Sequence, residues 1–162
     1  MTDTGSKPIT LLGMTGWHIS VYRLGQSATL DGVSNVQELR AKFPTAWKGD
    51  AYEDHKVGQS LCQGERIAVW QAELGGIDWL MDLFNAERAL GLGNGYPFYF
   101  FAFARDLTPT ILKGPPYAKE TWSFSPGDVI GPGWDGHTAI DTEVIAKCSP
   151  SEWLTVEAFD ES

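Results

Sequence analysis

The residues best suited to acid–base chemistry or cation binding lie close together near the C-terminus. His137 ends a glycine-rich loop and is soon followed by Asp141 and Glu143. If residues 139–147 form a strand, the two carboxylates share one face of it, because side chains two positions apart point the same way. A histidine with two carboxylates can bind a divalent cation or transfer protons. The alternative, which we favour, is a structural loop in which Trp134 fills the core edge and the acids face water.

Acidic residues and tryptophans are concentrated in the same part of the chain. Residues 135–162 contain seven acids and one base, Lys147, and so hold -6 of the formal net charge of -9. Tryptophan is enriched among the residues that dominate binding energy, and carboxylates steer a basic partner toward a surface. We therefore expect one acidic partner-binding face with at least one partly exposed tryptophan. Its predicted residues are Trp134, Asp135, Asp141, Glu143, Glu152, Trp153 and Glu157.

Other short motifs in the chain are incomplete. The run from Gly91 to Tyr96 begins like a dinucleotide-binding loop, but it lacks the third glycine and follows a predicted helix. No complete G-x-S-x-G nucleophile motif, H-E-x-x-H motif or C-x-x-C pair occurs. The sequence therefore predicts no catalytic residue, no cofactor and no metal, with His137, Asp141 and Glu143 as the alternative metal ligands.

Charge and composition restrict the partners and the compartment. An acidic chain repels phosphate backbones and anionic lipids, so we expect no direct nucleic-acid binding and no membrane binding. The longest apolar run, 98–104, is too short to cross a bilayer, and residues 1–8 do not resemble a signal peptide. Cys62 and Cys148 could form one disulfide, although reduced thiols are the favoured alternative. We expect a cytoplasmic monomer or small homo-oligomer.

Hydrophobic periodicity predicts an α+β fold over residues 9–162, after a flexible N-terminus at 1–8. The expected architecture is a mainly antiparallel sheet of about five or six strands with two or three helices and a loop-rich C-terminal third. Predicted strands are 9–12, 18–24, 65–72, 96–104, 121–124 and 139–147. Predicted helices are 34–43, opened by a capping box at Ser34 and Gln37, and 77–90, with loops at 44–64 and 105–138. A short helix is expected after Ser149, although residues 154–159 also alternate as a strand would.

Two classes of function are consistent with these features. The first is a non-catalytic binding protein that neutralises a basic protein partner through its acidic, Trp-containing C-terminal face. In size, acidity and expected compartment the chain resembles bacterial immunity proteins, and this resemblance implies a toxin as the partner. The second is a small enzyme or a ligand- or metal-binding domain that uses the loop around His137 with Asp141 and Glu143. A structural or phage-virion protein is a third alternative.

Overall fold

The computed structural model describes residues 16–24, 30, 32–44, 46, 48, 50–118 and 138–161. Its strands are β1 (Trp17–Arg23), β2 (Arg66–Ala72), β3 (Ala89–Gly93), β4 (Phe98–Phe103), β5 (Ala139–Ile140) and β6 (Trp153–Asp160). Its helices are α2 (Val36–Ala41), α3 (Ala51–Ser60), α4 (Asp78–Asn85), α5 (Ala104–Leu112) and α6 (Thr142–Lys147). The predicted strands 9–12 and 121–124 lie outside the described residues.

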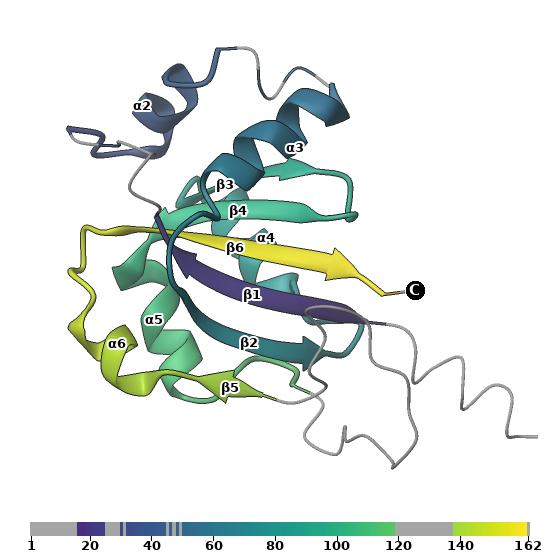
Figure 1. Cartoon of the computed structure of the whole chain (residues 1–162), viewed down its shortest axis with the longest axis vertical. Coiled ribbons are helices and arrows are strands. Elements are labelled where there is room, and N and C mark those ends of the chain that lie inside the picture. The colour runs from purple at the N-terminus through teal and green to yellow at the C-terminus, as the bar shows by residue number, and fades with distance from the viewer. Residues whose placement is uncertain are drawn as a thin grey trace, which may run out of the picture.

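The strands form one six-stranded antiparallel sheet in the order β3-β4-β6-β1-β2-β5. The last strand of the chain, β6, lies in the middle of the sheet between β4 and β1 (Figure 1). The predicted α+β class and the antiparallel sheet are confirmed. The described residues contain five helices, more than the two or three expected.

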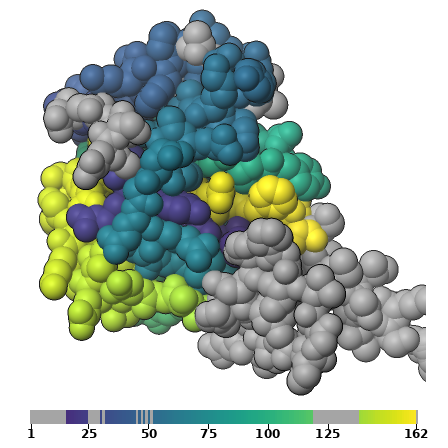
Figure 2. Space-filling model, in the orientation of Figure 1, coloured from purple at the N-terminus to yellow at the C-terminus, as the bar shows by residue number. Residues whose placement is uncertain are grey.

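Helices cover the two faces of the sheet unequally. One face packs into a core beneath α4, α5 and α6 that includes Trp70, Phe100 and Leu107. The other face packs under α2 and α3 near β3 and β4, in a core that includes Leu39, Tyr99 and Phe101. In Figure 1, α3 lies in front of the sheet beside β3 and β4, and in Figure 2 atoms of β1, β2 and β6 reach the surface next to it. Part of this second face is therefore left open by the helices.

The prediction for β4 is confirmed because its apolar residues alternate between the two cores. Phe100 faces the first core and is 2% exposed, while Tyr99 and Phe101 face the second. A strand with apolar side chains on both faces is stable only where both faces are covered, and β4 is paired on both edges, with β3 and with β6.

Two expectations for the first half of the chain are wrong. Residues 51–60, expected within a loop, form α3, and Asp50 caps this helix by accepting from the backbone N–H groups of Tyr52 and Glu53 at 3.0 and 3.3 Å. The N-cap of α2 is Asn35 rather than Ser34, because Asn35 accepts from the backbone N–H of Glu38 at 2.8 Å. The Glu38 carboxylate accepts from the backbone and hydroxyl of Ser34, each at 2.8 Å, so the return bond reaches the residue before the N-cap and the predicted capping box between Ser34 and Gln37 is not formed.

Further corrections concern the boundaries of strands and helices later in the chain. The predicted helix 77–90 ends early, because residues 89–93 pair with β4 as strand β3. Residues 105–112, expected as loop, lie in α5, which begins at Ala104, the last residue of the predicted strand 96–104. The predicted strand 139–147 is strand for two residues and then becomes α6, and the helix expected after Ser149 is instead the central strand β6.

Candidate functional site

The described acids of the predicted face are divided along the sheet. Asp141, Glu143 and Glu152 lie on segments near Arg23, whereas Glu157 pairs with Ser20 and Tyr99 farther along the strands. Asp141 is the N-cap of α6 and accepts from the backbone N–H of Val144 at 3.1 Å, while Glu143 lies in the first turn of the same helix. Because this segment is helical, Asp141 and Glu143 do not share a strand face as expected. Trp134, Asp135 and His137 lie outside the described residues, so the alternative site around His137 stays a prediction.

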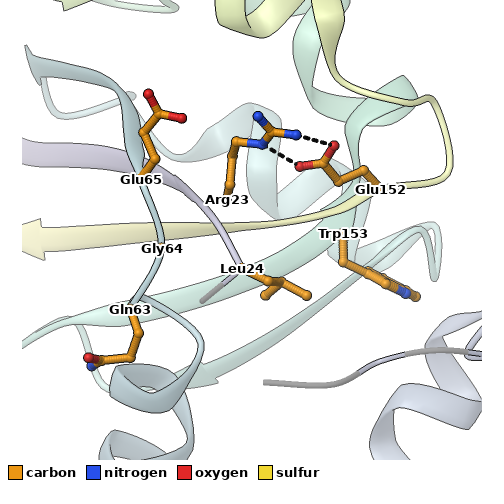
Figure 3. A pocket seen from close by; sticks show the side chains of 7 residues that line it. All are labelled: Arg23, Leu24, Gln63, Gly64, Glu65, Glu152 and Trp153. Atoms are coloured by element: carbon orange, nitrogen blue, oxygen red, sulfur yellow. Dashed lines mark hydrogen bonds and ion pairs between the residues drawn. The ribbon is translucent and has the colours of Figure 1, made fainter. Parts of the chain in front are cut away.

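Two more predicted residues lie at the start of β6, where the charges are paired. The Arg23 guanidinium donates from Nε and Nη2 to the Glu152 carboxylate at 2.7 and 3.0 Å. This ion pair spans a cavity of about 690 Å³, and Figure 3 shows the two side chains pointing toward each other. Trp153 is 4% exposed, stacks on Phe103 at 4.1 Å and donates to a backbone oxygen. It therefore offers no exposed ring to a partner.

The two ends of the sheet differ in charge. The end near Arg23 is formed by the described segments 22–24, 63–68, 103–105 and 139–152, which contain four acids and four Lys or Arg residues. The opposite end, on the right in Figure 1, is where β1 and β4 begin and where β2 and β6 finish. Its described segments are 16–19, 71–79, 94–98, 115–118 and 157–161, which contain the five acids Glu73, Asp78, Glu157, Asp160 and Glu161 and no Lys or Arg. Among the described residues of the two ends, the excess of acids over Lys and Arg therefore lies at the second end.

This second end also exposes aromatic and aliphatic side chains. Tyr96 and Phe159 are 56% and 45% exposed, and their rings pack edge to face with centroids 6.2 Å apart. Leu74, which follows β2, and Tyr117, which follows α5, are also exposed. These four are a majority of the seven large apolar side chains that are exposed in the described chain. We call the surface formed by Leu74, Tyr96, Tyr117, Phe159 and the five acids the acidic end.

Local structure holds these side chains close to one another. Trp17 donates from its indole nitrogen to the carbonyl of Leu74 at 3.2 Å, and its ring stacks on Phe98 at 5.9 Å. The backbone N–H of Glu73 donates to the carbonyl of Tyr117 at 2.9 Å, which connects the chain after α5 to the end of β2. The acidic end is therefore built by backbone pairing between segments that are distant in sequence.

A cluster of titratable groups adjoins the acidic end on the open face of the sheet. Glu157 lies opposite Tyr99 of β4 and Ser20 of β1 in the sheet register. The Tyr99 hydroxyl forms a hydrogen bond with Nδ1 of His55 in α3 at 3.2 Å. Burial raises the pKa of Glu157, against the opposing influence of His55 and Arg66. The carboxylate is thus partly desolvated without full compensation from nearby positive charge.

The phenols and the thiol of this cluster are not activated as nucleophiles. Burial raises the pKa of the Tyr22 and Tyr99 phenols and of the Cys62 thiol, and the nearby Glu157 adds to each shift. These groups therefore hold their protons near neutral pH, whereas a nucleophile needs a lowered pKa. Within the described ranges no three His, Cys, Asp or Glu side chains are placed to hold a metal ion. A half-buried carboxylate beside aromatic rings is instead suited to contact a cation.

Sequence reasoning did not identify Leu74, Tyr96, Tyr117 or Phe159 as surface residues. The available signal was weak: Tyr96 lies in a Gly- and Pro-containing turn, and Phe159 ends an alternating strand on the side away from Ala158. Among the residues of the predicted face that the structure describes, Glu157 alone belongs to the acidic end.

Comparisons with known proteins give no relative for this chain. No protein-family model matches it, and no curated protein or solved structure matches it. In the part of the chain that the structure describes, no helix is long and apolar enough to cross a membrane. The functional argument therefore depends on the surface chemistry.

Proposed function

We propose that the chain is a non-catalytic binding protein of the immunity or inhibitor type, which neutralises a basic protein partner such as a toxin. The observation that supports this most directly is the exposed Tyr96–Phe159 pair within a surface that contains five acids and no described Lys or Arg. Exposed aromatic rings supply contact area at an interface, while surrounding carboxylates increase the rate of encounter with a basic partner.

The proposal keeps the predicted class of function and moves the binding surface. The sequence places that surface in residues 135–162, and the proposal places it at the acidic end. Near Glu152 the acids are balanced by Arg23 and other cations, so that region offers little net attraction for a basic protein. At the acidic end the described segments supply no Lys or Arg, and Arg66, which acts on Glu157, lies at the start of β2.

Site-specific photocrosslinking in the source cells tests the proposal. A benzophenone amino acid replaces Tyr96 in one variant and Phe159 in another. Matched controls carry it at Tyr52 on α3 and at Leu112 on α5, which are also exposed but lie outside the acidic end. We expect both acidic-end variants to form an adduct with the same basic protein, and the controls not to form it.

A functional assay then follows from the adduct. The crosslinked protein is expressed alone and together with this chain, and we expect the chain to suppress its activity or toxicity. An acidic adduct, different adducts at Tyr96 and Phe159, or the same adduct at Tyr52 would contradict the proposal.

A further inference from the structure

Glu157 is the acid of the acidic end that lies farthest inside the sheet. Its neighbours across the strands are Tyr99 and Ser20, both almost fully buried, and its own side chain is half-buried. No hydrogen bond or ion pair joins its carboxylate to another described side chain, although Arg66 and His55 act on it electrostatically. A partly desolvated carboxylate in this position gains from a cation that approaches through the open face.

Aromatic rings lie around this carboxylate. Phe159 follows two positions later on the same face of β6, at a distance of about 7 Å along the strand. Tyr99 lies directly across on β4, and the phenol of Tyr22 on β1 is near enough for Glu157 to raise its pKa. The exposed Phe159 ring is braced by its edge-to-face contact with Tyr96. A cation bound at Glu157 would therefore contact an aromatic face as well as a carboxylate.

These features fit a guanidinium group better than an ammonium group. A guanidinium is planar and weakly hydrated, so it can donate two hydrogen bonds to a carboxylate while stacking on a ring. An ammonium is compact and strongly hydrated, and it loses more on leaving water. Charge complementarity and the flanking rings therefore select an arginine-bearing partner.

We propose that Glu157 is the anchor for an arginine side chain of the partner, which pairs with the carboxylate and stacks on Phe159. This inference rests on the proposed function, because it names the residue of the basic partner that the acidic end receives. Removing the carboxylate at this position should cost affinity through faster dissociation, since buried charge pairs act mainly on the off-rate.

The test uses acetyl-arginine amide as the probe, with acetyl-citrulline amide as its uncharged analogue. Each is titrated at millimolar concentration into the full chain and followed by NMR at the Glu157 carboxyl and the Phe159 ring. The variants are Glu157→Gln, which keeps the side-chain shape, and Glu143→Gln, a matched loss of one exposed acid at the other end of the sheet.

We expect arginine amide to shift the Glu157 and Phe159 signals in the wild type and in Glu143→Gln. Citrulline amide should not shift them, and Glu157→Gln should lose the response. Equal shifts with citrulline amide, or an unchanged response in Glu157→Gln, would overturn the inference.

Binding measurements with the partner obtained by crosslinking distinguish a failure of this inference from a failure of the proposed function. If Glu157→Gln increases the dissociation rate at least tenfold and Glu143→Gln does not, the anchor is supported. If Glu157→Gln leaves binding unchanged while reversal of the other acids weakens it, the anchor is wrong and the proposed function stands.

Discussion

Replacing Gly58 with alanine tests how α3 is seated on the sheet. In an exposed helix interior this change stabilises by about 0.5–1 kcal/mol, because alanine loses less backbone entropy than glycine. Here a Cβ at position 58 would lie 2.3–2.5 Å from three ring atoms of Tyr99, inside van der Waals contact. The Tyr99 ring is fully buried, so it has no free space to enter.

The expected result is a net loss of stability. Overpacking of a closely packed contact typically costs about 1–3 kcal/mol, which exceeds the gain in helix propensity. Urea unfolding should therefore give a lower midpoint for Gly58→Ala with an unchanged slope. The hydrogen bond between Tyr99 and His55 should also weaken, since the ring must move away from α3.

A double-mutant cycle with Tyr99→Ala isolates the contact. Removing the ring removes the clash, so Gly58→Ala should cost much less in this background, and the coupling energy should exceed about 1 kcal/mol. If Gly58→Ala stabilises both backgrounds equally, α3 is not packed on Tyr99 and the described position of His55 beside the Glu157 cluster is wrong.

Other consequences of the structure can be measured on the purified chain. Phe100→Asp should destabilise by more than about 3 kcal/mol in urea unfolding, because it buries an unpaired charge, while Phe100→Leu should cost far less; equal midpoints would contradict the double-sided burial of β4. Because the pKa of Glu157 is raised in the fold, its protonated form is favoured there, so its contribution is greatest at low pH and falls as pH rises through the folded pKa. Glu157→Gln should therefore gain stability relative to wild type as the pH rises above about 4.3, the ordinary pKa of a glutamate, and a constant difference would refute the burial of this carboxyl. Glu152→Gln should cost less than about 1 kcal/mol, since the Arg23 side chain in that pair is 38% exposed.

Local sequence patterns predict a strand well where its own residues show which of its faces are buried. Apolar side chains at every position of 98–103 indicate a strand covered on both sides, and β4 has that environment. The start of β6 is different, since Ser149 and Glu152 match a helix cap while residues 154–159 alternate as in a strand. These residues form a strand because they pair with β1 and β4, and both partners are far from β6 in the sequence.

The acidic end could not be predicted from the sequence because it is a product of topology. Glu73 is close to Tyr117 because the chain after α5 pairs with the end of β2, and Asp160 is close to Gly95 because β6 lies beside β4. The number of acids along the chain favours a binding face that includes Asp141 and Glu143, but the fold places these two acids near Arg66. The helix α3 has no wide apolar stripe in its sequence, because a glycine, Gly58, and a polar side chain, His55, make close contacts with Tyr99 of the sheet.

The association rate of the crosslinked partner tests the central claim most directly. Reversal of Glu73 and Glu161 to Lys at the acidic end is compared with reversal of Glu65 and Glu143 to Lys at the other end, so both variants change the net charge equally. We predict that the first variant associates about tenfold more slowly at low salt, with a flatter salt dependence, while the second stays near the wild-type rate. Equal slowing in both variants, or a larger effect at Glu65 and Glu143, would contradict a partner surface at the acidic end.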